Sequence, residues 1–273
     1  MSTDSVKMKI MRKTAFFIFL IISFTSVLSA MNFNAKALKK AKGFSWKTTS
    51  SQNFTYYFEA DSPAERDIEN IKAFTEKGRS KAEELLAGSS DVKIEYFLVD
   101  SKKRMKEMTG GYDADAWNNG TVQASIYGEK TRAIGAHETV HCLSRVLWGK
   151  TNGNWLNDGL AVYADDQLYG LDIHREAKWL LDHGKLLPVS EMVVNMNWKK
   201  PGNKFYPQSG SFLKFIYEKY GISSVKEFWQ KGIEKGTARI GKTLLQLEEE
   251  WLSELAGIDA TGADKDSMYG IGH

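Results

Sequence analysis

The pentapeptide His137-Glu138-Thr139-Val140-His141 decides how this chain of 273 residues is interpreted. On an α-helix its two histidines lie one turn apart on the same face, where their imidazoles can bind one metal ion. Glu138 cannot reach that ion from its own angular position, but it can take a proton from a water molecule held there. The pentapeptide therefore predicts a hydrolytic metal site. The alternative is a pair of histidines on an ordinary surface or core helix that binds no metal.

The residues around the pentapeptide favour a helix. No proline occurs between Glu129 and Trp148, and apolar residues recur at steps of three and four, the spacing of one helical face. This apolar stripe consists of Ala136, Val140, Leu143 and Leu147. Gly149 then supplies a helix stop. We expect this helix to be the central, buried helix of the fold.

The first 37 residues have the layout of an export signal. Basic residues between Lys7 and Lys13 precede an apolar run at 15–28, and a small-x-small cleavage site follows at Ala35-Lys36-Ala37. The run is short for a membrane span. We therefore predict a signal peptide at residues 1–37 and a secreted or cell-envelope protein without stable membrane insertion. The alternative is an uncleaved N-terminal helix that anchors the protein.

Without this leader the chain is nearly neutral. The leader contains five basic residues and one acid, which leaves 32 basic and 33 acidic side chains of the totals of 37 and 34. No stripe of Lys and Arg interleaved with aromatic residues is present, so we expect no nucleic-acid partner. Cys142 is the only cysteine, which excludes a disulfide within the chain. Because it follows His141 off the histidine face, we interpret it as a small core residue.

Strand patterns and helix patterns lie in different halves of the chain. The strands are expected before the pentapeptide, and the chain after it is expected to be mostly helical. The N-terminal elements are expected at 53–59 (strand), 62–87 (helix), 92–99 (strand), 101–108 (helix) and 121–127 (strand). The later helices are expected from Trp155 onward and at 173–183, 209–219, 223–232 and 241–255. The sequence thus predicts an α+β fold, with a strand-containing N-terminal lobe and a mostly helical C-terminal lobe on either side of the metal site.

We expect one domain at 38–260 and a flexible tail at 261–273, which has glycines and few apolar side chains. The basic segment that follows the leader is expected to be mobile. The segment 121–127 alternates apolar and polar residues and predicts a half-buried strand just before the metal helix. At a sheet edge its backbone could pair with an extended peptide; otherwise it is a plain sheet strand.

A carboxylate is expected as the third metal ligand, because two histidines alone do not make a stable zinc site. The segment 155–165, Trp-Leu-Asn-Asp-Gly-Leu-Ala-Val-Tyr-Ala-Asp, offers Asp158 and Asp165. They are two helical turns apart, about 10.5 Å along the axis, and cannot both bind one ion through short side chains. Asp158 is nearer the turn that leaves the His141 helix. Asp166 points about 100° away from Asp165 and is expected to be solvated.

The two motifs together resemble the gluzincin zinc metallopeptidases, specifically the peptidase MA-like proteins, whose second helix commonly reads W-L-x-E-G-x-A-x-Y-x-E. Asp158 stands where that family has its zinc-binding glutamate, and Asp165 where it has a later acid. The resemblance implies a zincin-like fold in which His137, His141 and Asp158 bind Zn²⁺.

Aspartate is one methylene shorter than the family's glutamate. Gly159 would allow the two helices to approach and compensate for that difference. Asp165 would then orient an imidazole through its other ring nitrogen. The alternative is that Asp158 only caps the start of its helix.

The segment Phe205-Tyr206-Pro207-Gln208-Ser209-Gly210-Ser211-Phe212 also resembles the family, in which a tyrosine just ahead of a helix donates a hydrogen bond to the developing oxyanion. The resemblance implies this role for Tyr206; a purely structural aromatic is the alternative. The G-x-M-E-N strand of the aminopeptidase branch is not found, so exclusive trimming of N-termini is not supported.

These residues predict a secreted zinc-dependent metallopeptidase acting on a peptide or protein substrate. Zn²⁺ would lower the pKa of bound water toward about 7, Glu138 would pass the water's proton to the leaving amine, and Tyr206 would stabilise the oxyanion. One alternative is a zinc hydrolase acting on a non-peptide amide or ester. Another is a non-catalytic envelope binding module on a zincin fold, although binding alone would not require Glu138.

Overall fold

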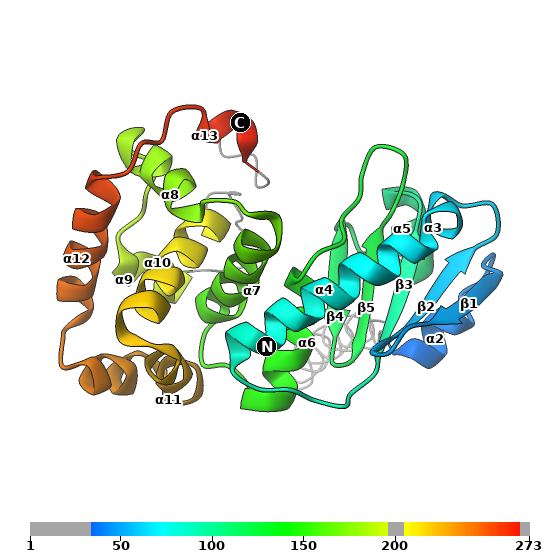
Figure 1. Ribbon diagram of the computed structural model, residues 1–273, viewed down its shortest axis with the longest axis horizontal. Coiled ribbons are helices and arrows are strands. Elements are labelled where there is room, and N and C mark those ends of the chain that lie inside the picture. Colours follow the sequence, from blue (N-terminus) through cyan, green and yellow to red (C-terminus); the bar gives the residue numbers. More distant parts are fainter. Residues whose placement is uncertain (1–33, 196–204, 268–273) are drawn as a thin grey trace, which may run out of the picture.

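The computed structural model describes residues 34–195 and 205–267. In this described part five strands form one mixed sheet near the N-terminus and the rest is mostly helical, so the fold class is α+β, as predicted (Figure 1). The strands are β1 (Trp46–Ser50), β2 (Phe54–Glu59), β3 (Ile94–Val99), β4 (Ala116–Asn119) and β5 (Val122–Ile126). Their order is β1-β2-β3-β5-β4, with parallel pairs inside the sheet and an antiparallel pair at each edge.

Helices cover both faces of the sheet. On one face, α4 (Ile68–Leu86) and α6 (His137–Trp148) contribute Ile71 and Cys142 to a core with alternate residues of β2 and β3. On the other face, α2 (Ala35–Lys39) and α5 (Lys102–Thr109) pack on the opposite side chains of β3 and β5. The short helix α3 (Pro63–Arg66) precedes α4, so the single helix expected at 62–87 is divided at Asp67.

The C-terminal part contains α7 (Asn154–Tyr169), α8 (Ile173–Asp182), α9 (Val189–Asn195), α10 (Phe205–Tyr220), α11 (Ile222–Ile240), α12 (Leu244–Ala256) and α13 (Ala263–Asp266). Helix α7 lies between α6 and α10 and joins the two parts of the fold (Figure 1). Its Gly159 faces α10, where an added Cβ would lie 2.8 Å from the Ser209 carbonyl oxygen. The expectation that Gly159 brings α7 toward the histidine helix is therefore wrong, because this glycine serves the contact with α10.

Two strand features differ from the expectations. Strand β5 lies inside the sheet, and β4 forms the edge. Both faces of β5 are buried, so the prediction of a half-buried strand is wrong. The reason is that α6 covers the polar face, where the Thr139 hydroxyl donates to the Gln123 side chain at 3.4 Å.

The segment before β2 was expected to be mobile, but it forms α2 and β1. The two elements are joined by the Trp46 indole, which donates to the Leu38 carbonyl at 3.1 Å. The aromatic residue near the start of β1 thus supplies a contact that the basic composition of the segment did not reveal.

The expected signal peptide falls almost entirely on residues 1–33, outside the described residues. Of the expected tail, the described part, 261–267, contains α13 and contacts α8, where the Arg175 guanidinium donates to the Thr261 carbonyl. The domain bounds 38–260 stay a prediction. No helix in the described ranges is long and apolar enough to cross a membrane.

Candidate metal centre

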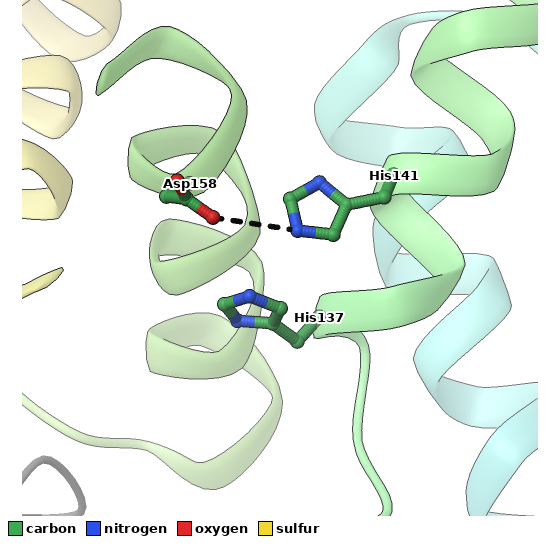
Figure 2. Close-up of side chains that lie close together, drawn as sticks. All are labelled: His137, His141 and Asp158. Atoms are coloured by element: carbon green, nitrogen blue, oxygen red, sulfur yellow. Dashed lines mark ion pairs between the residues drawn. The ribbon is translucent and has the colours of Figure 1, made fainter. Parts of the chain in front are cut away.

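Helix α6 begins at His137 and carries His141 one turn later. Figure 2 shows both imidazoles projecting toward α7, where Asp158 faces the ring of His141. One potential ligand atom from each of the three residues lies within 4.8 Å of the other two, and His141 Nε2 is 3.6 Å from Asp158 Oδ1. The structure therefore brings together the three residues that the sequence suggested as metal ligands.

The carboxylate of Asp158 fits a cation site. Its residue is 1 % exposed, and among the described residues neither of its oxygens has a hydrogen-bond partner. A buried carboxylate without such partners is costly unless a cation compensates it. Ligand atoms bound tetrahedrally to zinc at about 2.0–2.2 Å lie roughly 3.4 Å apart, so small side-chain shifts close the observed group around one ion.

Electrostatics at the three residues also fits a cation. Burial raises the pKa of Asp158 to about 7, with a further contribution from Glu138 and an opposing one from His137. Burial alone would lower the pKa of His137, but Asp165 and the nearby carboxylates raise it to about 9. The pKa of His141 is lowered by burial and by His137. A divalent cation would favour the ionised form of Asp158 and the neutral forms of both histidines, which are the forms that bind metal.

Asp165 fixes the start of α6. The N-cap residue of this helix, Ala136, provides no side-chain acceptor. Instead Asp165 Oδ1, from α7, accepts the backbone N–H groups of Ala136 at 2.9 Å and His137 at 3.1 Å. Its other oxygen lies 3.5 Å from His137 Nδ1, where it can orient the imidazole. Sequence reasoning proposed the contact with the imidazole but missed the helix cap.

Asn118 holds the side chain of Glu138. Its amide, on edge strand β4, donates to Glu138 Oε2 at 2.6 Å. Burial raises the pKa of Glu138, while His137 and this hydrogen bond act in the opposite direction. Sequence reasoning missed Asn118, because β4 is short and has no alternating apolar pattern.

Tyr206 lies in the first turn of α10, which begins at Phe205 and not at residue 209 as expected. Its ring centroid is 6.2 Å from that of His137. Burial, together with the negative charges of Asp158 and Glu138, raises the pKa of Tyr206, so its hydroxyl remains protonated and can donate. Tyr112, which sequence reasoning did not single out, also has its pKa raised by burial and by the same two carboxylates.

Asp166 is not solvated as expected, because it is only 3 % exposed. It accepts a hydrogen bond from the Lys214 ammonium at 2.8 Å and another from the backbone N–H of Ile173 at 3.0 Å. The turn to α8 and the packing of α10 close over that side of α7. Asp166 is therefore a structural ion-pair residue turned away from the metal group. Cys142 is fully buried in the core, as predicted.

Searches of the sequence against protein-family models and against curated proteins give no match. Among solved structures, the chain is similar to an aminopeptidase N family protein from Idiomarina loihiensis, with 13 % sequence identity and a TM-score of 0.39. The similarity covers 82 % of this chain and 46 % of that chain, so the present chain spans about half the length of that protein. The likeness is distant, and the assignment of the site depends on its own geometry.

Proposed function

We propose that this protein is a zinc-dependent metallopeptidase that acts in the cell envelope or outside the cell. The observation that carries the proposal is the buried, unsatisfied carboxylate of Asp158 beside two histidines, with the carboxylate of Glu138 next to them. Binding of a metal alone would not require that fourth group. The location follows from the leader sequence, and the resemblance to the gluzincins supports both the metal and the reaction.

His137, His141 and Asp158 would hold the ion. When bound there, zinc would act as a Lewis acid and would lower the pKa of a water molecule toward about 7. Glu138 accepts the proton of the attacking water and delivers it to the leaving nitrogen. Asn118 binds one oxygen of Glu138 and so fixes the orientation of the other.

Tyr206 and Asp165 complete the site: the first stabilises the oxyanion and the second orients a metal ligand. Tyr206 stays protonated beside the histidines and donates a hydrogen bond to the oxyanion that develops on the substrate carbonyl. Asp165 holds His137 in place through the backbone and the ring. Because every one of these contacts joins different elements, the site depends on the packing of α6 against β4, α7 and α10.

Glu138→Gln tests the proposal. The variant should bind one zinc per chain, because the three ligands remain, but its kcat should fall by several orders of magnitude because the proton acceptor is lost. Metal content is measured by mass spectrometry of the purified protein, and hydrolysis by digestion of a peptide library. Glu234→Gln, at an exposed position on α11, is the matched control.

Equal turnover by Glu138→Gln and the wild type would contradict the proposal. A panel of esters and non-peptide amides, measured beside the peptides, separates a peptidase from a hydrolase of another substrate class. A wild type that binds zinc but hydrolyses nothing in either panel would instead support a binding module.

A further inference from the structure

A cavity of about 320 Å³ opens directly beside Glu138 and His137. It lies between the β4–β5 hairpin and the loop that leads into α6, with Tyr169 of α7 and Tyr206 of α10 on its other side. Its volume is at the lower end of the range for ligand sites and is enough for one large side chain. Its place beside the general base would put it next to a scissile bond.

The floor of the cavity is formed by the sheet. Ala116 of β4 and Ser125 of β5 are cross-strand partners and both line it. The Tyr96 hydroxyl, from β3, donates to Ser125 Oγ at 2.9 Å, and both residues are only 1 % exposed. The hydroxyl proton of Tyr96 is therefore already used, and the floor offers a substrate mainly carbon surface.

The wall opposite the sheet consists of small or apolar residues. Ala133, Ile134 and Gly135 form it, and the Tyr169 hydroxyl is committed to the carbonyl of Ile134. An added Cβ at Gly135 would lie 2.7 Å from Asp165 Oδ1, so a larger residue at position 135 would displace the carboxylate that caps α6. Because Ala133 and Gly135 have small side chains or none, they leave space in the cavity for a substrate side chain.

The charged residues around the cavity have partners within the chain. At the rim, Arg132 pairs with Asp67 at 3.3 Å, and Asp115 pairs with Lys102 at 3.4 Å. Deeper in, Asp165 is committed to the start of α6. Glu138 is the general base, and an ammonium group bound to it would block that role. A charged substrate side chain would therefore lose its hydration without gaining a free partner of opposite sign.

We propose that this cavity is the subsite that selects the substrate, and that it takes a large uncharged side chain, aromatic or aliphatic, next to the scissile bond. The inference rests on the proposed peptidase function and names its substrate class. Tyr169 and Tyr206 add aromatic surface to the lining, which favours a phenylalanine side chain in particular.

The test uses the zinc-loaded full chain and matched quenched peptides that differ only at the residue flanking the cleaved bond. The flanking residue is identified first, from the cleavage sites in a peptide library. Peptides with Phe or Leu there should have a kcat/KM roughly 10 to 200-fold above the Ala peptide, and Asp and Lys peptides should fall below it. A library with no such preference on either side of the cleaved bond would overturn the proposal.

Two variants fill the cavity from opposite sides: Ala116→Leu from the sheet and Ala133→Leu from the wall. Each should lower kcat/KM for the Phe peptide by about 10-fold or more while changing the Ala peptide little, because the added methylenes occupy the space of the substrate ring. Ala238→Leu, at an exposed position on α11, is the control for the substitution itself. An equal loss for both peptides in both filled variants would contradict the assignment.

Binding to Glu138→Gln gives a readout that does not need turnover. Calorimetry should show tighter binding of the Phe peptide than of the Ala peptide, and the difference should disappear when Ala116→Leu is added. Selective binding without any cleavage by the wild type would retain the subsite and reject the peptidase function. Cleavage without selectivity would retain the peptidase function and reject the subsite.

Discussion

Asp158 is the residue whose role is decided by burial and not by proximity alone. It is enclosed without a hydrogen-bond partner among the described residues, whereas Asp165 accepts two backbone N–H groups. Both lie near the histidines, but only Asp158 has two buried oxygens without a hydrogen-bond partner in the described part of the chain. The geometry thus separates the two aspartates that the sequence left as rival ligands.

We therefore expect Asp158→Asn to abolish stoichiometric zinc binding, and Asp165→Asn to weaken it by roughly 10 to 100-fold, as for loss of a group that orients a ligand. Asp166→Asn should leave zinc binding unchanged and lower only the melting temperature, because Asp166 binds Lys214 and Ile173. Metal content and a competition titration with a chelator measure all three. Zinc that survives Asp158→Asn and is lost with Asp165→Asn would reverse the assignment.

Tyr206→Phe should reduce kcat by about 10²-fold or more with little change in KM, because a donor to the oxyanion acts only in the transition state. Steady-state kinetics on the best peptide measures this. Tyr112→Phe is the matched comparison, since that hydroxyl is influenced by the same carboxylates from a different loop. A larger loss in Tyr112→Phe than in Tyr206→Phe would assign the donor to Tyr112 instead.

At the residue scale, the sequence predicted the groups that repeat at fixed local spacing. His137 and His141 are brought together by four residues of helix, so their pairing needs no knowledge of the fold. The contact of Asn118 with Glu138 spans 20 residues and two element types, and the cap by Asp165 spans 28 or more. No local pattern encodes such contacts, because they depend on how α6 packs against β4 and α7.

At the scale of elements, α6 is a helix whose first turn is completed by its neighbour. The N-terminal N–H groups of a helix need acceptors, and the preceding residue here is an alanine. Asp165 supplies the acceptor from α7 and adds a negative charge at the positive end of the helix dipole. The metal group and the helix start are thus held by the same segment of α7.

Asp165→Ala should accordingly destabilise the metal-free protein by about 1–2 kcal/mol, the usual cost of removing a helix cap. Urea unfolding in the presence of a chelator measures this without any contribution from zinc. Asp165→Asn keeps an acceptor oxygen and should lose less. Equal stability of wild type and Asp165→Ala would show that the backbone groups of α6 find other acceptors.

The sequence predicted β5 but neither its burial nor the neighbouring strand β4. The alternation in 121–127 identified β5, but the polar face expected to be exposed is covered by α6. Strand β4 was missed, although only the turn at Gly120 and Thr121 separates it from β5. Periodicity gives the existence of a strand and its two faces, whereas what covers each face is decided by packing.

On the scale of the whole molecule, one hydrophobic core joins the two parts. It runs from Leu85 of α4 and Val140 of α6 to Trp155 of α7 and Trp251 of α12. The metal group lies at the contact of α6 with α7, within this continuous packing. The predicted arrangement of a sheet-containing part and a helical part around the site is confirmed. The long-range contacts that join the two parts could not be predicted from local sequence patterns.

The pH dependence of stability offers a test far from the metal group. Glu176 of α8 is 5 % exposed, and its carboxylate accepts a hydrogen bond from Ser267 at 2.5 Å. Burial raises the pKa of Glu176 to about 7; the bond from Ser267 opposes the shift and Asp166 adds to it. The folded protein therefore keeps this proton at a pH where the unfolded chain, with a pKa of about 4.3, has lost it.

Stability contributed by this protonated carboxyl is present below about pH 4 and is lost as the pH rises toward 7, because the native state binds more protons than the unfolded state across that interval. The loss is complete at about pH 8, at up to about 4 kcal/mol for a pKa raised from about 4.3 to about 7. Glu176→Gln stays neutral, so it should gain stability relative to the wild type as the pH rises from 5 to 8. Chelator-treated proteins are compared by urea unfolding, with Glu234→Gln as the control. The difference between wild type and Glu176→Gln cancels the titration of the histidines, which both proteins share. Parallel stability curves over this range would mean that the Glu176 carboxyl is hydrated in the folded protein, and that α13 does not seal it against α8.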